Sequence, residues 1–124
     1  MIIPDTSVWI EFFKTHQPYF GELRDYLEQH EILAISPVFG ELLQGVRNIS
    51  EKKIILEYWN YLPKIDETDL LIKAGVYSFE NKLISKGVGI IDGCIMVSAI
   101  ENNAVVWTLD EKLKRVSQKE YLHM

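Results

Sequence analysis

Short apolar runs of strand length recur along this chain, and each is followed at once by residues that begin a helix. The runs are Ile2-Ile3, Ile32 to Ile35 and Ala104 to Trp107. Apolar residues at helical spacing follow each run after a turn of only a few residues. Strands that alternate with helices over short links form a parallel sheet, because right-handed crossovers return the chain to the same edge. The pattern therefore predicts an α/β protein with a central parallel sheet and helices on both faces.

Capping residues and prolines mark where the helices begin. The expected helices start near Thr6, Pro18, Ser36, Ser50, Thr68, Asp92 and Asp110. The segment from Thr68 to Lys86 is expected to be the longest helix, because its apolar residues repeat every three to four positions until Gly87. A further short strand is expected near Ile65.

The composition is that of one compact domain spanning residues 1–124. A chain of 124 residues with 48% hydrophobic content is long enough for one core and too short for two. No apolar run approaches the roughly 20 residues of a membrane-spanning helix, and the N-terminus lacks the pattern of a signal peptide. Cys94 is the only cysteine, which rules out an internal disulfide and a thiolate zinc site. We therefore expect a cytoplasmic protein with no membrane partner.

Four acidic residues stand beside these apolar segments: Asp5, Glu41, Asp92 and Asp110. Taken singly, each of the three aspartates is explained as a helix N-cap. Glu41 differs, because it lies one turn into an apolar helix where an unpaired glutamate is uncommon. Ligands of an open α/β sheet bind outside the carboxyl ends of its strands, where these acids are expected to gather. Together they predict a site for Mg²⁺ or Mn²⁺, ions that prefer carboxylate oxygens.

Hydroxyl side chains accompany the first and last of these acids. Thr6 and Ser7 follow Asp5 directly, and Thr108 lies two residues before Asp110. Such neighbours orient metal-ligating carboxylates or a metal-bound water through hydrogen bonds. We expect Thr6 and Ser7 to do so at Asp5 and Thr108 at Asp110.

The net charge of −5 at first argues against a nucleic-acid partner, since phosphates are usually bound by Lys and Arg. Without the four candidate ligands the charge is −5 + 4 = −1, and two divalent ions would neutralise the site. A two-ion site of this kind activates water for attack on a phosphodiester and needs no histidine. Among the basic residues, which mostly decorate solvated helix faces, Arg47 and Lys86 are the expected RNA contacts.

At this point the sequence resembles the PIN domain, a small metal-dependent ribonuclease fold, and within it the VapC toxins of bacterial and archaeal toxin-antitoxin pairs. Four blocks carry the resemblance, each containing one of the acids. The blocks are Ile3 to Ile10, Ile35 to Gly45, Asp92 to Ala99 and Val105 to Asp110. The match extends from Ile2 to about Val116, and the ordered set is specific where any one block is weak.

The resemblance implies a three-layer sandwich and Mg²⁺- or Mn²⁺-dependent endonucleolytic cleavage of RNA. It also implies a cognate antitoxin as partner and a homodimer. The chain departs from the family pattern at Met96, Leu109 and Leu113, which affects packing and RNA contact and leaves the acids intact. The fourth acid is the most variable in the family, so Glu111 is the nearest substitute for Asp110.

Other functions remain open beside the nuclease. A phosphoacceptor receiver domain fits poorly. It needs an acceptor aspartate after its third strand and a lysine after its last long strand, and neither is evident here. The stronger alternative is a PIN-like module with weak catalysis that serves as a binding partner for an antitoxin or RNA. Core packing and a partner surface are equally good explanations for a group of five aromatic residues. They are Trp9, Phe12, Phe13, Tyr58 and Trp59.

Overall fold

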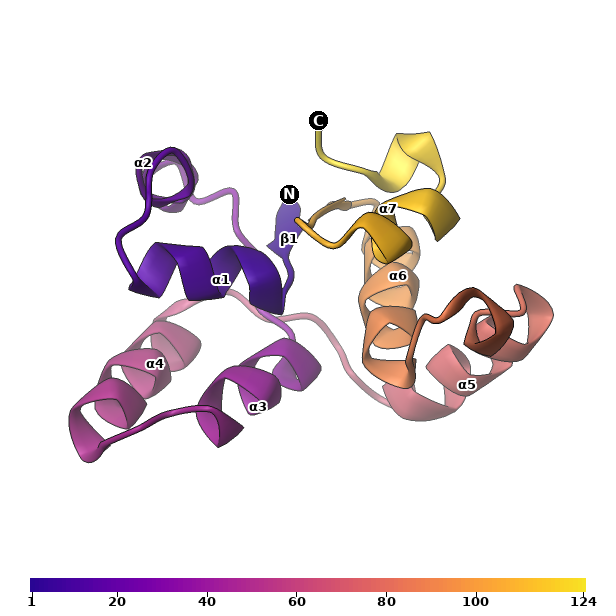
Figure 1. Cartoon of the computed structure of the whole chain (residues 1–124), viewed down its shortest axis with the longest axis horizontal. Coiled ribbons are helices and arrows are strands. Elements are labelled where there is room, and N and C mark those ends of the chain that lie inside the picture. Colours follow the sequence, from indigo (N-terminus) through magenta and orange to yellow (C-terminus); the bar gives the residue numbers. More distant parts are fainter.

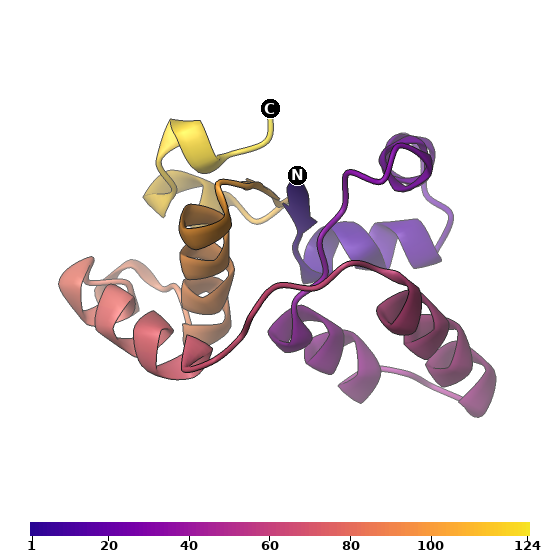
Figure 2. The same cartoon turned by 180° about the vertical axis from the view of Figure 1, so that it is seen from behind.

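A pair of short strands lies between two groups of helices in the computed structural model, which describes all 124 residues. Strands β1 (Ile2–Pro4) and β2 (Val105–Trp107) pair in parallel. The helices are α1 (Thr6–Phe13), α2 (Tyr19–Glu28), α3 (Ser36–Gln44), α4 (Ile49–Tyr61), α5 (Leu70–Glu80), α6 (Ile90–Asn102) and α7 (Glu111–Val116), with 3-10 turns η1 (Ile84–Lys86) and η2 (Lys119–Tyr121). Helices α1 to α4 lie on one side of the strands and α5 to α7 on the other (Figures 1 and 2).

The sheet is parallel, as the sequence predicts, but it is smaller than expected. Segments beside the two strands contribute only isolated parallel bridges, which join Ile2 to Ile32, Ala34 to Lys64 and Val106 to Leu122. The strands expected at 32–35 and near 65 are therefore only isolated bridges. At 32–35 the two bridging residues have different neighbours, because Ile32 pairs with Ile2 and Ala34 with Lys64. The α/β class and the parallel direction are confirmed, while the three-layer sandwich stays a prediction.

Aromatic residues on α1 form the centre of the main core. Trp9 is fully buried, and the rings of Phe12, Phe39 and Tyr58 lie 5.3 to 5.9 Å from its ring, centroid to centroid. Phe13 stacks on the same tryptophan at 5.6 Å. Such ring pairs add to the free energy gained by burying the apolar area alone. The sequence explained these aromatic residues equally well as core or as a partner surface. In the structure they pack largely into the core.

The longest expected helix is interrupted. Helix α5 ends at Glu80, and a separate 3-10 turn follows. Lys82 adopts a left-handed backbone conformation (φ 55°), and the Leu83 N–H donates back to the Ser78 carbonyl at 3.0 Å. Buried Leu83 holds this turn in place. The prediction of one helix over 68–86 is therefore wrong at its C-terminal third.

Two N-caps also differ from expectation. Asn48 rather than Ser50 caps α4, and its side chain accepts the Glu51 N–H at 2.9 Å. Gly89 rather than Asp92 is the N-cap of α6, which places Asp92 at the third helical position. Asp5 and Asp110 cap α1 and α7 as predicted. None of the helices combines the length and apolar character that a membrane-spanning segment requires.

Candidate metal-binding and catalytic site

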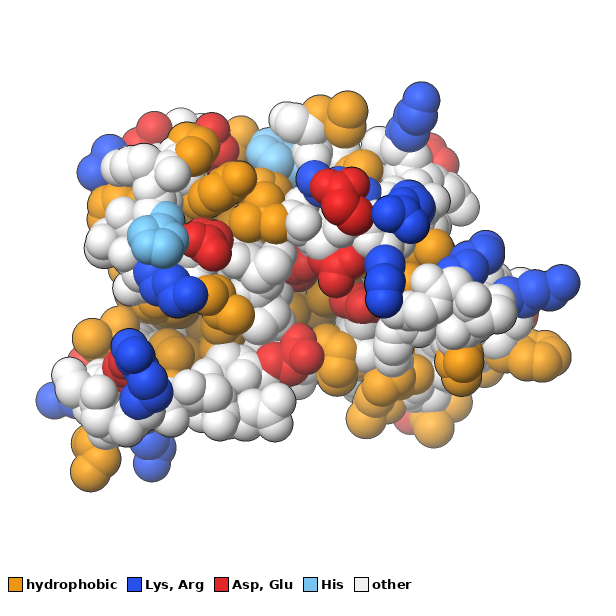
Figure 3. Space-filling model, in the orientation of Figure 1, with side chains coloured by type: hydrophobic (Ala, Val, Ile, Leu, Met, Phe, Trp, Pro, Cys, Tyr) orange, Lys and Arg blue, Asp and Glu red, His pale blue; other side chains and the backbone are white.

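All four acids predicted from the sequence line one pocket of about 280 Å³. Four further residues complete its lining, which are Thr6, Ser7, Ile10 and Ile95. Acidic side chains gather in the middle of the face that lies between the two groups of helices (Figure 3). The strand ends and the starts of three helices thus bring together residues that are up to 105 positions apart, from Asp5 to Asp110.

The backbone fixes Asp5 at the end of β1. The strands are in register up to Pro4 opposite Trp107, and the Asp5 N–H donates to the Trp107 carbonyl at 2.9 Å. The carboxylate also accepts the Val8 N–H at 3.2 Å, so it caps α1. Asp5 can therefore cap α1 and line the pocket at the same time, because a carboxylate has several lone pairs that accept hydrogen bonds.

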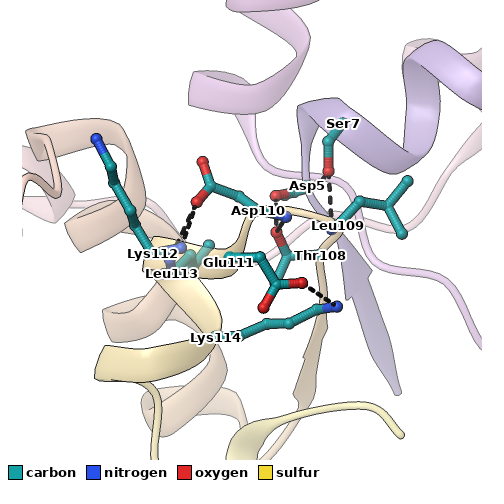
Figure 4. Close-up of polar contacts among 9 residues, drawn as sticks. All are labelled: Asp5, Ser7, Thr108, Leu109, Asp110, Glu111, Lys112, Leu113 and Lys114. Atoms are coloured by element: carbon teal, nitrogen blue, oxygen red, sulfur yellow. Dashed lines mark hydrogen bonds and ion pairs between the residues drawn. The ribbon is translucent and has the colours of Figure 1, made fainter.

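Two hydroxyl side chains donate hydrogen bonds to the Asp5 carboxylate. Ser7 Oγ donates to Oδ1 at 2.5 Å, and Thr108 Oγ1 donates to Oδ2 (Figure 4). The hydroxyls are themselves fixed, because Leu109 N–H donates to Ser7 Oγ and Asp110 N–H to Thr108 Oγ1, both at 3.0 Å. Burial raises the pKa of Asp5 above its usual value, and these hydrogen bonds oppose the rise. Thr108 therefore donates to the Asp5 carboxylate, and its contact with Asp110 is to the backbone N–H of that residue.

Glu41 enters the pocket from α3. Its Oε1 accepts the Thr6 hydroxyl at 2.6 Å, and the side chain is half-buried. Thr6 was expected to orient Asp5, but the first turn of α1 directs its hydroxyl toward α3 instead. The second carboxylate oxygen of Glu41 has no hydrogen-bond donor from the protein.

Asp92 is the most perturbed acid of the pocket. Burial and the charges of Asp110, Asp5 and Glu41, in that order, raise its pKa from 3.8 to about 6, and the Gly89 N–H partly opposes them. Like charges that lie close together disfavour ionisation of one another. The shift therefore shows that the four carboxylates are close enough to interact.

Asp110 reaches the pocket from the start of α7. Its Oδ1 accepts the N–H groups of Lys112 at 2.8 Å and Leu113 at 3.2 Å, which leaves Oδ2 free (Figure 4). Glu111, the substitute considered from the sequence, does not line the pocket, and its carboxylate lies 3.4 Å from Lys114 Nζ. Of the two acids, Asp110 is therefore the one that the fold directs into the site.

The donor set fits a hard divalent cation. It consists of carboxylate and hydroxyl oxygens, with no cysteine or histidine in the lining. As the side chains lie, no three of the acids converge tightly enough to surround one ion. Glu41 and Asp110 nevertheless each have a carboxylate oxygen that could bind a cation. A bound cation would also relieve the charge repulsion that raises the pKa of Asp92.

The two basic residues expected to contact RNA lie outside the acidic pocket. Arg47 pairs with Glu51 at 2.9 Å, and Lys86 Nζ donates to the Asn81 carbonyl at 3.1 Å. Their contact with RNA stays a prediction. Ile10 and Ile95, the apolar walls of the pocket, were not predicted from the sequence. Each lies about one helical turn after a site residue, Ile10 after Thr6 and Ile95 after Asp92.

The family model of the PIN domain matches residues 2–119, which is nearly the whole chain. The protein therefore belongs to the PIN domain family. PIN domains are generally nucleases and typically use divalent metal ions. A search among curated proteins gave no significant match.

Proposed function

We propose that this protein is a Mg²⁺- or Mn²⁺-dependent endoribonuclease and the toxin of a type II toxin-antitoxin pair of the VapC kind. One observation carries the nuclease part: the four acids line one pocket, where burial and then the charges of the other three raise the pKa of Asp92 to about 6. A cluster that costs free energy in the empty protein is expected where a cation is bound. Membership of the PIN family supports the same chemistry.

The residues of the site have different roles. Ser7 and Thr108 donate to Asp5, which fixes the orientation of this buried carboxylate and opposes the rise in its pKa that burial causes. Thr6 fixes the orientation of Glu41 in the same way. Asp92 and Asp110 face them from the other group of helices, so a cation between the four would tie the two groups together. When bound, divalent ions lower the pKa of water and neutralise charge on a phosphodiester.

The antitoxin part of the proposal is supported by an apolar groove next to the acidic pocket. The groove has a volume of about 430 Å³ and lies among α1, α3 and α4. Ile10 lines both the groove and the acidic pocket, so a peptide seated in the groove has a direct path to the acids. Lys14 lines the groove and is available to an acidic residue of the same partner, whereas Arg47 is already paired with Glu51.

A binding module with weak catalysis is the competing function. Nothing in the site favours it, because every acid of the pocket is present and two of them retain a free oxygen. A module that serves only for binding gains nothing from carboxylates whose repulsion destabilises the fold.

Cleavage of total cellular RNA by the purified protein tests the proposal. We expect cleavage with Mg²⁺ or Mn²⁺, none after chelation, and a loss of about 100-fold or more in both Asp5→Asn and Asp92→Asn. Glu111→Gln is the matched control, because this neighbouring acid points away from the pocket. Cleavage that persists in both aspartate variants would contradict the proposed site. Absence of both metal binding and cleavage would favour the binding module, while metal binding without cleavage would indicate a restricted RNA target that the assay lacks.

A further inference from the structure

One stretch of the chain, residues 62–69, connects the two groups of helices. Figure 2 shows this connecting segment crossing from α4 in one group to α5 in the other. Asp5 and Glu41 come before the crossing along the chain, and Asp92 and Asp110 come after it. The way in which the connecting segment is attached to the helices therefore affects the distance between the two pairs of acids.

Glu67 in the connecting segment caps helix α3. Its carboxylate accepts the Ser36 N–H at 2.8 Å and also the Ser36 hydroxyl. The residue at the N-cap position of α3, Ile35, has no side-chain acceptor of its own. Because a helix N-terminus has unpaired N–H groups and favours a negative charge, a carboxylate from 31 residues away takes the place of the usual N-cap side chain.

The same residue also contacts the start of α5. The Glu67 carbonyl accepts the Leu70 N–H at 3.0 Å. Helix α5 packs on α6, where Leu70 and Cys94 belong to one small apolar cluster. After burial, the charge of Glu67 contributes to the raised pKa of the Cys94 thiol, so this carboxylate lies near α6 as well. Glu67 thus joins the helix that carries Glu41 to the pair of helices that carries Asp92.

We propose that Glu67 is a positioning residue of the acidic pocket, which sets the separation of Glu41 from Asp92 by holding the start of α3 on the connecting segment. Glu41 follows Ser36 by five residues within one short helix, so a shift of the helix start moves this carboxylate too. Divalent cations hold oxygen ligands within about 2.0–2.6 Å, which makes their binding sensitive to such a shift. This role rests on the proposed function, because the separation matters only where the acids share a cation.

A second contact keeps the connecting segment in place when the Glu67 side chain is removed. The Ala34 N–H donates to the Pro63 carbonyl at 3.1 Å, and Leu62 is buried in the main core. Variants at Glu67 should therefore fold, with a change that is confined to the start of α3.

The neighbouring Asp66 provides a matched control. Its carboxylate also accepts one N–H and one hydroxyl, both from Thr68, at 2.9 and 2.7 Å. These bonds stay within the connecting segment and do not reach α3. Asp66→Ala therefore removes the same kinds of hydrogen bond as Glu67→Ala without releasing the helix that carries Glu41.

Calorimetric titration of the whole protein with Mn²⁺ tests the positioning role. We expect binding that is about 10-fold weaker in Glu67→Ala and unchanged in Asp66→Ala. Glu67→Gln should recover part of the loss, because its amide oxygen can still accept one of the two donors of Ser36. Hydrogen exchange of the metal-free proteins gives a second readout, in which the Ser36 amide should exchange faster in Glu67→Ala only. Circular dichroism melts confirm that each variant is folded.

The possible results separate this role from the proposed function. Mn²⁺ binding by Glu67→Ala as tight as that of the wild type, or an equal loss in Glu67→Ala and Asp66→Ala, would overturn the positioning role alone. So would a Ser36 amide that exchanges equally fast with and without the Glu67 carboxylate. A wild type that binds no Mn²⁺ would overturn the proposed function and the positioning role with it.

Discussion

Asp92 illustrates a conflict between stability and function at the scale of one residue. The surrounding acids and partial burial favour its protonated form, with a pKa of about 6 against 3.8 in the unfolded chain. The folded protein therefore binds more protons than the unfolded chain between these two values, and its stability falls as pH rises through this window. Above pH 6 the destabilisation is fully present, and below 3.8 it is absent.

Replacing Asp92 by Asn should therefore stabilise the metal-free protein at neutral pH. The side chain is partly exposed, so we discount the shift for solvent screening and expect a gain of about 1 kcal/mol in the free energy of unfolding. This corresponds to a rise of roughly 3–5 °C in Tm. Thermal unfolding in EDTA at pH 7.5 and pH 4 measures it, and the gain should be several-fold smaller at pH 4, which lies just above the unfolded value of 3.8. An equal gain at both pH values would show that charge repulsion is not the cause.

Thr108 offers a second test at residue scale. Its buried hydroxyl donates to Asp5 and accepts the Asp110 N–H, so Thr108→Val leaves both groups without this partner. We expect a loss of about 1–3 kcal/mol in the free energy of unfolding at neutral pH. Thr108→Ser retains the hydroxyl and should recover most of it. Denaturant titration of both variants measures the difference, and equal losses would mean that methyl packing, not the hydrogen bonds, is responsible.

The acids and the contact of Ser7 with Asp5 could be predicted from the sequence, but the partners of Thr6 and Thr108 could not. Asp5 and Asp110 stand where a strand gives way to a helix, which fixes them at the same edge of a parallel sheet. The partners of Thr6 and Thr108 depend on rotamers and on the register of distant segments. Thr108 meets Asp5 across 103 residues, and Thr6 turns to Glu41 on another helix. Sequence spacing contains no information about either contact.

At the scale of elements, the approach of α6 to α5 explains why a glycine follows Asp92. A Cβ at Gly93 would lie 3.2 Å from the Ala74 carbonyl oxygen, which is backbone and cannot move alone. Helix α6 would have to shift, and Asp92 with it. Gly40 on α3 is the matched position, because a Cβ there meets nothing within 4 Å.

The same substitution should thus have opposite effects at these two glycines. Gly93→Ala is expected to destabilise the fold by about 1–3 kcal/mol, since crowding outweighs the better helix propensity of alanine. Gly40→Ala should stabilise it by up to about 1 kcal/mol. Chemical denaturation measures both. Stabilisation by Gly93→Ala would contradict the close packing of α5 on α6.

Element types were easier to predict than their edges and faces. Apolar periodicity located α5, but it did not show that Ile72, Val76 and Phe79 face outward, because an exposed apolar stripe and a buried one have the same period. The strand expected at 32–35 forms two isolated bridges instead, because Ile32 pairs with Ile2 and Ala34 with Lys64. Propensity alone does not predict which neighbour each residue of a short segment meets.

At the scale of the whole molecule, a net charge of −5 coexists with the proposed cleavage of a polyanion. The acids that contribute most to the repulsion line the pocket that is proposed to receive the metal. Positive charge for binding phosphate is then supplied by the ions, and an extended basic surface is not required. On this account the protein without metal should bind RNA weakly, and the central claim is that the four carboxylates act together as a site for divalent cations.

Calorimetric titration with Mn²⁺ at neutral pH tests that claim most directly, in the wild type beside Asp5→Asn, Asp92→Asn and the Glu111→Gln control. The account predicts saturable binding of one or two ions by the wild type and the control. It also predicts binding that is weaker by about 10- to 100-fold or lost in the two aspartate variants. No binding by the wild type, or equal binding by all four proteins, would contradict it.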